Sequence, residues 1–498
     1  MPIDLKNNIF FRCFIAVFCA VLLFYTLGFM IWTVFNTETG NGDNVEHIHS
    51  TWLVFNNKVP YRDFFQHHNP LLWYVFAPFI GFITNQITLL DIAHSIGMIA
   101  GCMTFFVVYK ISVRFFSDKI PTILSILTLC APYFYIYCFN YNPDTFMALF
   151  YAIGLYYLFL YWEESKLISL VISFFSFFVA FMFTQKILAI YGLLGFLCLY
   201  VFYKKHTSIS DIACSLLLPL LGLGVFIAYL YNKDALGIYW QTNYIFNVRM
   251  QDYYGDWKIN VVDRNVLEPA LVLSIISIVC FWNKSSIYFK ILSILFITEA
   301  IQRYFYFAIA PYYMLPLMIY SACINSVAIN KILEKKYEFA IIFLMLATYY
   351  SYTTKDKYLS ARGTDRSFAR YIANNVNQCD YVLSSFLGNQ SIISKDPHYY
   401  WALLGHIDIA GEELGIHPKP NVTELVLKYK PKFVYGGMYF DNYSKNRGRS
   451  IFIQQVDSKV LDTYYLPTPF PDFYLLKYEY QQKNCKYNKD QKDWMYEN

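Results

Sequence analysis

The sequence predicts an α-helical polytopic membrane protein with a small C-terminal α/β domain. Of the 498 residues, 57% are hydrophobic and only 15% are charged, whereas soluble domains have about a quarter of charged residues. The apolar residues gather in long runs, each able to supply the roughly 20 helical residues that cross a bilayer core. Polarity returns to ordinary values only near the C-terminal end. We therefore expect a transmembrane domain over residues 1–353 and an α/β domain over 354–498.

The apolar runs predict about eleven transmembrane helices. Their approximate limits are 9–35, 87–113, 120–139, 145–162, 167–184, 187–203, 210–231, 265–282, 290–307, 311–330 and 338–353. Lys and Arg are more frequent in the loops that share a side with the N-terminus, which predicts a cytoplasmic N-terminus. Eleven spans then put the C-terminal domain on the outer side of the membrane.

The first outer loop, residues 36–86, contains two further helical segments. Val45, Ile48 and Trp52 recur at helical spacing, which predicts an amphipathic helix lying on the membrane. The apolar stretch 71–82 is too short to span the bilayer and carries aromatic residues that suit the interface. We expect two in-plane helices in this loop.

The polar tail alternates predicted helices and strands. We expect helices over 367–376 and 422–429, with Asn421 as N-cap of the second, and strands over 381–385 and 433–435. Of the 11 cysteines, only Cys379 and Cys485 lie in this tail. They could pair in an oxidising compartment, and spacing alone does not show whether they do.

The net charge of +5 is thinly spread and includes no long basic stretch, so we expect no nucleic-acid partner. Two outer carboxylates stand out, Asp43 in the first loop and Asp144 after the third span. Each is either a loop residue or helix N-cap, or one of two catalytic carboxylates of which one deprotonates a hydroxyl. Glu46 lies one helical turn after Asp43.

The stretch 60–70 combines Arg62, Asp63, His67 and His68 with aromatic residues. It is either an interfacial anchor with a weak surface ion pair, or a phosphate or sugar site. His47 and His49 are close in sequence, but no recognised zinc spacing is present. The cofactor is unknown, and a divalent metal is possible but not indicated.

Three cations lie on the outer side: Lys186 follows the fifth span, Arg249 lies in the outer loop 232–264, and Arg303 lies near the outer end of the ninth span, ahead of Tyr313. A cation in this position is either a membrane anchor or part of a site for an anionic headgroup.

The order of these features resembles that of bacterial integral-membrane glycosyltransferases of the C-type fold. The nearest group is family 39, with the protein mannosyltransferases and the aminoarabinose transferases of lipid A. The family's first-loop Asp-Glu resembles 43–44, where Asn stands in place of Glu. Its basic residue before a proline-rich run resembles 68–74, with His68 in the basic place. Asn142-Pro143-Asp144, Gln185-Lys186 and 313–316 resemble its later motifs.

The resemblance implies inverting transfer of a sugar from a polyprenyl-phosphate donor to a hydroxyl group. The acceptor would be an envelope glycan such as lipopolysaccharide or O-antigen, another lipid, or a protein. It implies a bacterial inner-membrane protein with a periplasmic C-terminal domain. The implied catalytic residues are Asp43 and Asp144. The implied phosphate-binding residues are Arg303, His68, Lys186 and Arg249, and the implied substrate-binding residues are Glu46, Arg62, Asp63, His67 and Tyr313.

The main alternative is a transporter or flippase of a polyprenyl-linked lipid or glycan. Transporters are typified by inverted repeats and charged residues at the membrane midplane. This sequence shows no internal repeat, and its candidate residues lie near the outer face. An O-antigen polymerase or ligase and a non-catalytic scaffold are further alternatives.

Overall fold

The computed structural model describes residues 9–36, 42–127, 140–249, 264–305, 314–362, 366–383, 392–401, 405–435, 456–482, 484–488 and 493–496. The chain forms two compact units. The first, called the helical unit, comprises Met1–Phe35, His94–Gly224 and Lys258–Ala361. The second, called the loop–tail unit, comprises Asn36–Ala93, Val225–Trp257 and Arg362–Asn498.

Each predicted span coincides at least in part with a helix. These helices are α1 (Ile9–Asn36), α4 (Gln86–Phe115), α5 (Lys119–Ser125), α7 (Pro143–Glu164), α8 (Leu167–Phe183), α9 (Leu188–Lys205), α10 (Ile209–Asn232), α13 (Arg264–Phe281), α14 (Ile287–Phe305), α15 (Leu315–Lys335) and α16 (Phe339–Arg362). Within the described residues, α1, α4, α7, α10 and α15 are long and apolar enough to cross a membrane by themselves. Residues 128–139 of the predicted third span lie outside the described residues.

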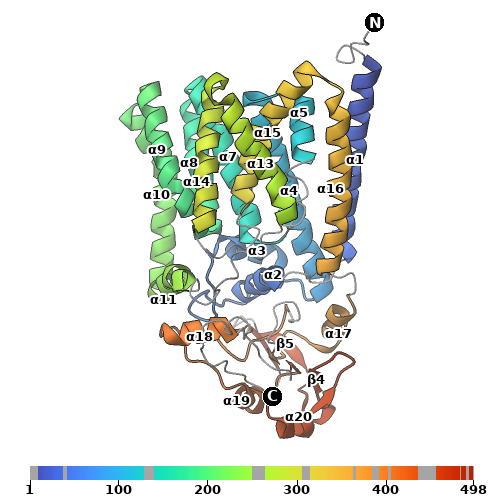
Figure 1. Cartoon of the computed structure of the whole chain (residues 1–498). Helices are drawn as coiled ribbons and strands as arrows, with labels where there is room; N and C mark the ends of the chain where they lie inside the picture. Colours follow the sequence, from blue (N-terminus) through green and yellow to red (C-terminus); the bar gives the residue numbers. More distant parts are fainter. Residues whose placement is uncertain are drawn as a thin grey trace. The chain divides into compact units, whose positions relative to one another are not determined.

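The helices of the helical unit run side by side (Figure 1). α7 and α8 form a tight antiparallel hairpin, in which Gly154 lets the ring of Phe177 approach: a Cβ atom at Gly154 would lie 2.5 Å from that ring. α15 packs against α5, α7, α13 and α14. Asn325 Nδ2 of α15 donates a hydrogen bond to Ala270 O of α13, and Asn325 Oδ1 accepts one from Ser274 Oγ, both at 3.0 Å. Such polar contacts are a usual means of joining helices in membranes.

The outward faces of several helices are apolar. In α10, Leu220 is 61% exposed and Val225 70%, and α1 presents Phe10 and Phe24 in the same way. Surfaces of this kind are unfavourable in water and favourable in lipid. The apolar helices are therefore those of a membrane protein.

The loop–tail unit combines short helices with small sheets. Its helices are α2 (Gly42–Phe55), α3 (Leu71–Ile80), α11 (Leu236–Trp240), α17 (Ser367–Asn375), α18 (Gly405–Glu413), α19 (Val422–Tyr429) and α20 (Ser458–Tyr464). Its strands are β1 (Val382–Leu383), β2 (Phe433–Tyr435), β3 (Tyr465–Pro467), β4 (Phe473–Leu476), β5 (Cys485–Asn488) and β6 (Asp493–Tyr496). One sheet has the order β1-β2-β4-β3, with β1 parallel to β2 and the other pairs antiparallel, while β5 and β6 form a hairpin.

The predicted elements of the tail are present. The helices over 367–376 and 422–429 are α17 and α19, and the Asn421 side chain caps α19 by accepting from the Thr423 and Glu424 amides. The two predicted strands are β1 and β2. The structure also contains the Cys379–Cys485 disulfide, which attaches β5 to the segment that precedes β1.

The two helices expected in the first outer loop are α2 and α3, and they pack against each other. The apolar residues Val45, Ile48 and Trp52 of α2 are buried as the periodicity predicts. However, the polar residues His49 and Ser50 are buried as well. The expectation of an amphipathic helix lying on the membrane is therefore not met by α2, because protein groups cover its polar face as well as its apolar face.

The tail does not form its core alone. Phe65 of the first loop and Phe246 lie in one hydrophobic cluster with Tyr400 and Val434 of the tail. The backbone of Phe65 is also hydrogen-bonded to the tail: its amide donates to Tyr399 O at 2.9 Å, and its carbonyl accepts from Trp401 Nε1 at 3.1 Å. This shared core is why the first loop and the tail fold as one compact unit.

Candidate active site

Asp144 is buried in the first turn of α7, where it is 1% exposed. The N-cap of this helix is Asn142, whose side-chain oxygen accepts from the Asp144 amide at 3.0 Å. Pro143 fills the first helical position, where its lack of an N–H has no cost. The interpretation of Asp144 as an N-cap is therefore wrong. The cap lies two residues earlier, which leaves the Asp144 carboxylate for other partners.

The Asp144 carboxylate faces Lys186. Lys186 Nζ lies 3.3 Å from Asp144 Oδ2, and its own side chain is mostly buried. The other oxygen, Oδ1, is buried and has no hydrogen-bond partner among the described residues. The structure thus joins a predicted catalytic carboxylate to a predicted phosphate-binding cation, and it leaves one carboxylate oxygen able to accept a ligand's hydrogen bond.

A break between two helices sets the position of Lys186. α8 ends at Phe183, and Thr184 adopts an extended conformation with φ −153° and ψ 132°. A single 3-10 turn, Gln185–Ile187, follows before α9 begins. Lys186 therefore lies on a short, tightly turned connection, which limits how far its side chain can move from Asp144.

Asp43 and Glu46 lie on α2 of the loop–tail unit. Asp43 is half-buried in the first turn of the helix, where a carboxylate is favoured by the helix dipole. Glu46, one turn later, is 8% exposed. A half-buried carboxylate at a helix start is accessible to a substrate, as a general base requires.

His67 and His68 lie close to Glu46. One ligand atom from each of these three side chains falls within 4.8 Å of the other two. The rings of His67 and His68 are 4.2 Å apart, and the ring of His47 is 5.2 Å from that of His68. Predicted substrate-binding and phosphate-binding residues thus gather at one place, and their donor atoms are of the kinds that bind divalent metals.

His49 fixes α2 to the tail. Its Nδ1 lies 2.8 Å from Ile392 O, and its Nε2 lies 2.8 Å from Asp396 Oδ2. Burial lowers the pKa of His49, but the charge of Asp396 and the two hydrogen bonds outweigh that effect, so the net shift is upward from 6.5. This contact determines where the helix that carries Asp43 and Glu46 lies within its unit.

We expect Asp396→Asn to destabilise the protein more at pH 6 than at pH 9. Because the folded-state pKa of His49 is raised, its stabilising contribution is complete below the unfolded value of 6.5 and is lost as pH rises through the folded value. Removing one partner of a buried pair costs about 3–5 kcal/mol. Thermal unfolding of the detergent-solubilised protein at both pH values measures the difference.

Asp493→Asn is the matched control for this prediction. Asp493 pairs with Lys395 at 3.1 Å in the same unit, and neither partner is a histidine. Its loss should have a nearly equal effect at pH 6 and pH 9. An equal effect of Asp396→Asn at the two values would contradict the assigned role of His49.

Arg62 and Asp63 form a bidentate pair. Arg62 Nε lies 2.8 Å from Asp63 Oδ1, and Nη2 lies 2.9 Å from Oδ2. Burial raises the pKa of Asp63, but hydrogen bonds from Arg62 and from the Val59 amide lower it by more than burial raises it, so the net shift is downward. Arg62 also donates to Lys233 O at 3.0 Å. The pair is partly exposed, and it is fixed to two other parts of the unit.

The same pair lines a cavity of about 450 Å³ in the loop–tail unit. Most of the other lining residues are aromatic or charged, among them Trp52, Tyr381, Lys395 and Tyr399. Aromatic faces combined with a few polar groups are typical of sites for small organic ligands. The cavity could therefore hold part of a polyhydroxylated substrate.

The remaining predicted site residues are Arg249, Arg303 and Tyr313. Arg249 is exposed and follows the π-helix Gln241–Phe246. Arg303 belongs to α14, and its side chain lies outside the described residues, as does the whole of Tyr313.

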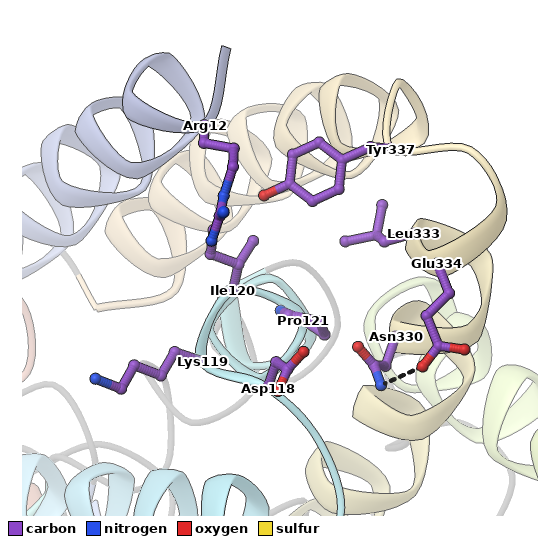
Figure 2. A pocket seen from close by; sticks show the side chains of 9 residues that line it. All are labelled: Arg12, Asp118, Lys119, Ile120, Pro121, Asn330, Leu333, Glu334 and Tyr337. Carbon is purple, nitrogen blue, oxygen red and sulfur yellow. Dashed lines mark hydrogen bonds between the residues drawn. The ribbon is translucent and has the colours of Figure 1, made fainter. Parts of the chain in front are cut away.

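A second cavity, of about 470 Å³, lies in the helical unit (Figure 2). Figure 2 shows the Tyr337 hydroxyl pointing toward Arg12, while a hydrogen bond of 3.1 Å joins Asn330 to Glu334. The predicted site residues are absent from its lining, which consists of Arg12, Asp118, Lys119, Ile120, Pro121, Asn330, Leu333, Glu334 and Tyr337. This cavity is not the candidate active site.

Two features of the structure were not predicted from the sequence. The partner of His49, Asp396, is 347 residues away, and no local pattern connects them. The second feature is Glu299 of α14, which is 1% exposed. Ionisable residues inside spanning helices are costly and therefore usually functional. Its position in an apolar run was the available signal.

Comparison with known families assigns the chemistry. Residues 70–231, about a third of the chain, match the family model described as dolichyl-phosphate-mannose-protein mannosyltransferase. The match supports a glycosyltransferase of the C-type fold. The chain is a membrane glycosyltransferase. The matched family implies a polyprenyl-phosphate sugar as the donor. A search of the curated proteins found no match.

The matched segment of this glycosyltransferase contains Asp144 and Lys186 but begins after His68 and ends before Arg249. It thus includes the buried ion pair of the helical unit, whereas Asp43 lies outside it. The match confirms the expected enzyme class and decides against the transporter alternative.

Proposed function

We propose that this glycosyltransferase transfers a sugar, with inversion, from polyprenyl phosphate to a hydroxyl of an envelope glycan, such as lipopolysaccharide or O-antigen. The reaction takes place on the periplasmic side of a bacterial inner membrane, where the tail 354–498 also lies. The family match over residues 70–231 carries the proposal. The Cys379–Cys485 disulfide supports the location, because disulfides persist in oxidising compartments.

In the proposed reaction, Asp43 accepts the proton of the acceptor hydroxyl. The acceptor oxygen then attacks the anomeric carbon, and the bond from that carbon to the phosphate oxygen breaks. The electron pair leaves with the polyprenyl phosphate. A single displacement inverts the anomeric configuration. Asp144 orients the acceptor or the base through its available oxygen.

Cations stabilise the leaving group. Arg303, Lys186, Arg249 and His68 bind the donor phosphate, since fixed positive groups are most effective where negative charge develops. Glu46, His67 and Tyr313 contact the substrates. Arg62 and Asp63 hold the acceptor in the cavity of the loop–tail unit, where aromatic faces and charged groups suit a carbohydrate.

Mass spectrometry of envelope glycans, lipids and proteins tests this function. Cells that lack the chain are compared with the same cells carrying it on a plasmid. We expect one sugar mass to be missing from the glycan fraction and restored by the plasmid. A sugar missing only from proteins would contradict the proposed acceptor, and unchanged masses in all fractions would contradict the function.

A further inference from the structure

The cluster of Glu46, His67 and His68 has the composition of a metal site. The three ligand atoms lie within 4.8 Å of one another. Glu46 and His68 are 8% and 5% exposed, and His67 is half-buried. Two imidazoles and one carboxylate are ligand types that bind divalent transition metals. Their ligand atoms are close enough together for all three side chains to bind one cation.

The backbone that carries the two histidines is held from several sides. Asn247 Nδ2 donates to His67 O at 2.9 Å, and the Tyr61 hydroxyl donates to His68 O at 2.6 Å. Gln66, next to His67, donates to Ser50 Oγ of α2 at 2.7 Å. The histidine loop is thus tied to the helix that carries Glu46. Such support keeps the ligands close before an ion arrives, which a metal site requires.

The donor set decides which ions fit. Two imidazoles and one carboxylate form the protein side of several catalytic zinc sites, and they leave a fourth position open. Zinc–ligand bonds of about 2.0–2.2 Å require the ligand atoms to move closer than 4.8 Å, which side-chain rotation can supply. Mg²⁺ and Ca²⁺ prefer sites made of oxygen atoms. The set therefore favours a divalent transition metal.

We propose that Glu46, His67 and His68 bind one divalent transition-metal ion, in the first place Zn²⁺. The open fourth position takes an oxygen of the donor phosphate; this step rests on the proposed function. The carboxylate and the ion together carry one positive charge. This site then supplies a fixed positive charge to the donor phosphate, on which His68 acts through the ion.

Metal analysis of the purified full-length protein tests the proposal without any activity measurement. The protein is loaded with Zn²⁺, Mn²⁺ or Co²⁺, freed of excess ion, and measured by inductively coupled plasma mass spectrometry. We expect about one Zn²⁺ or Co²⁺ per wild-type chain, and the visible spectrum of Co²⁺ should report nitrogen and oxygen ligands. Glu46→Gln and the double variant His67→Asn, His68→Asn should bind at least about tenfold more weakly.

His206→Asn is the matched control. His206 is exposed and ends α9 with φ +50°, a conformation that Asn tolerates well, so this variant should keep the ion. Wild-type protein without stoichiometric metal after loading would overturn the proposal, whatever the variants do. Undiminished metal in both cluster variants would overturn it too. A bound ion lost only from the cluster variants supports the site, even if the protein transfers no sugar.

Discussion

Asp43→Asn should reduce the rate of sugar transfer by about 10²–10⁴-fold, the usual contribution of a general base. An amide cannot take up the hydroxyl proton, so the acceptor oxygen would attack while still protonated. The loss corresponds to about 3–5 kcal/mol in the transition state. Release of polyprenyl phosphate by the purified protein, measured as kcat/KM, gives the number.

The fold should change little in this variant. Asp43 is half-buried in the first turn of α2, and the loss of a carboxylate near a helix start costs about 0.3–1 kcal/mol. The expected catalytic effect is several times larger than this structural one. Measuring thermal unfolding together with kcat/KM therefore separates the catalytic effect of the substitution from its structural effect.

Asp462→Asn serves as the control. Asp462 is an exposed carboxylate of α20 in the same unit, and neither its rate nor its unfolding temperature should change. If Asp43→Asn kept more than half of the wild-type rate, another group would have to be the base. Asp43→Glu should retain part of the activity, because it keeps a carboxylate within reach.

The sequence predicted the helices well because each depends on local composition. A run of some 20 apolar residues forms a helix wherever the surroundings are apolar, since every backbone group must be bonded within the segment. The tail helix α19 was equally predictable, because its cap Asn421 and its apolar face lie within one short stretch. Of the eleven predicted spans, five correspond to described helices that are long and apolar enough to cross a membrane alone.

The sequence did not predict what covers the polar face of α2. Periodicity identifies the apolar face, but it does not show whether His49 meets water or a carboxylate. The partner of His49 is Asp396, which belongs to the tail and lies far away in the sequence. The same limit applies to Asp144, where Asn142 and Asp144 are both good capping residues and only the backbone geometry distinguishes them.

The candidate site was predictable as a set of residues but not as an arrangement. Asp144 and Lys186 were selected separately, and the structure shows them in contact. His67 and His68 were selected together, and Glu46 separately from them, without the expectation that the three form one cluster. Zinc motifs depend on spacing along one element, whereas this cluster combines a helix with a loop, so motif spacing could not reveal it.

Lys186→Met should destabilise the protein by about 3–5 kcal/mol, because it leaves the Asp144 carboxylate buried without its cation. Adding Asp144→Asn removes that charge, and the double variant should regain most of the lost stability. Thermal unfolding in detergent measures both effects. Arg114→Met is the control: its pairs with Glu163 and Glu164 are exposed, so it should cost no more than about 1 kcal/mol.

The double variant also separates structure from chemistry. If Lys186 binds the donor phosphate and Asp144 orients the acceptor or the base, restoring stability does not restore transfer, and the double variant stays at least about tenfold below the wild-type rate. The effects of the two substitutions on stability would then be strongly coupled, whereas each single variant alone would already lose most of the activity. Wild-type transfer by a stable double variant would instead make the pair a purely structural contact between α7 and the turn before α9, and it would exclude both residues from the proposed mechanism.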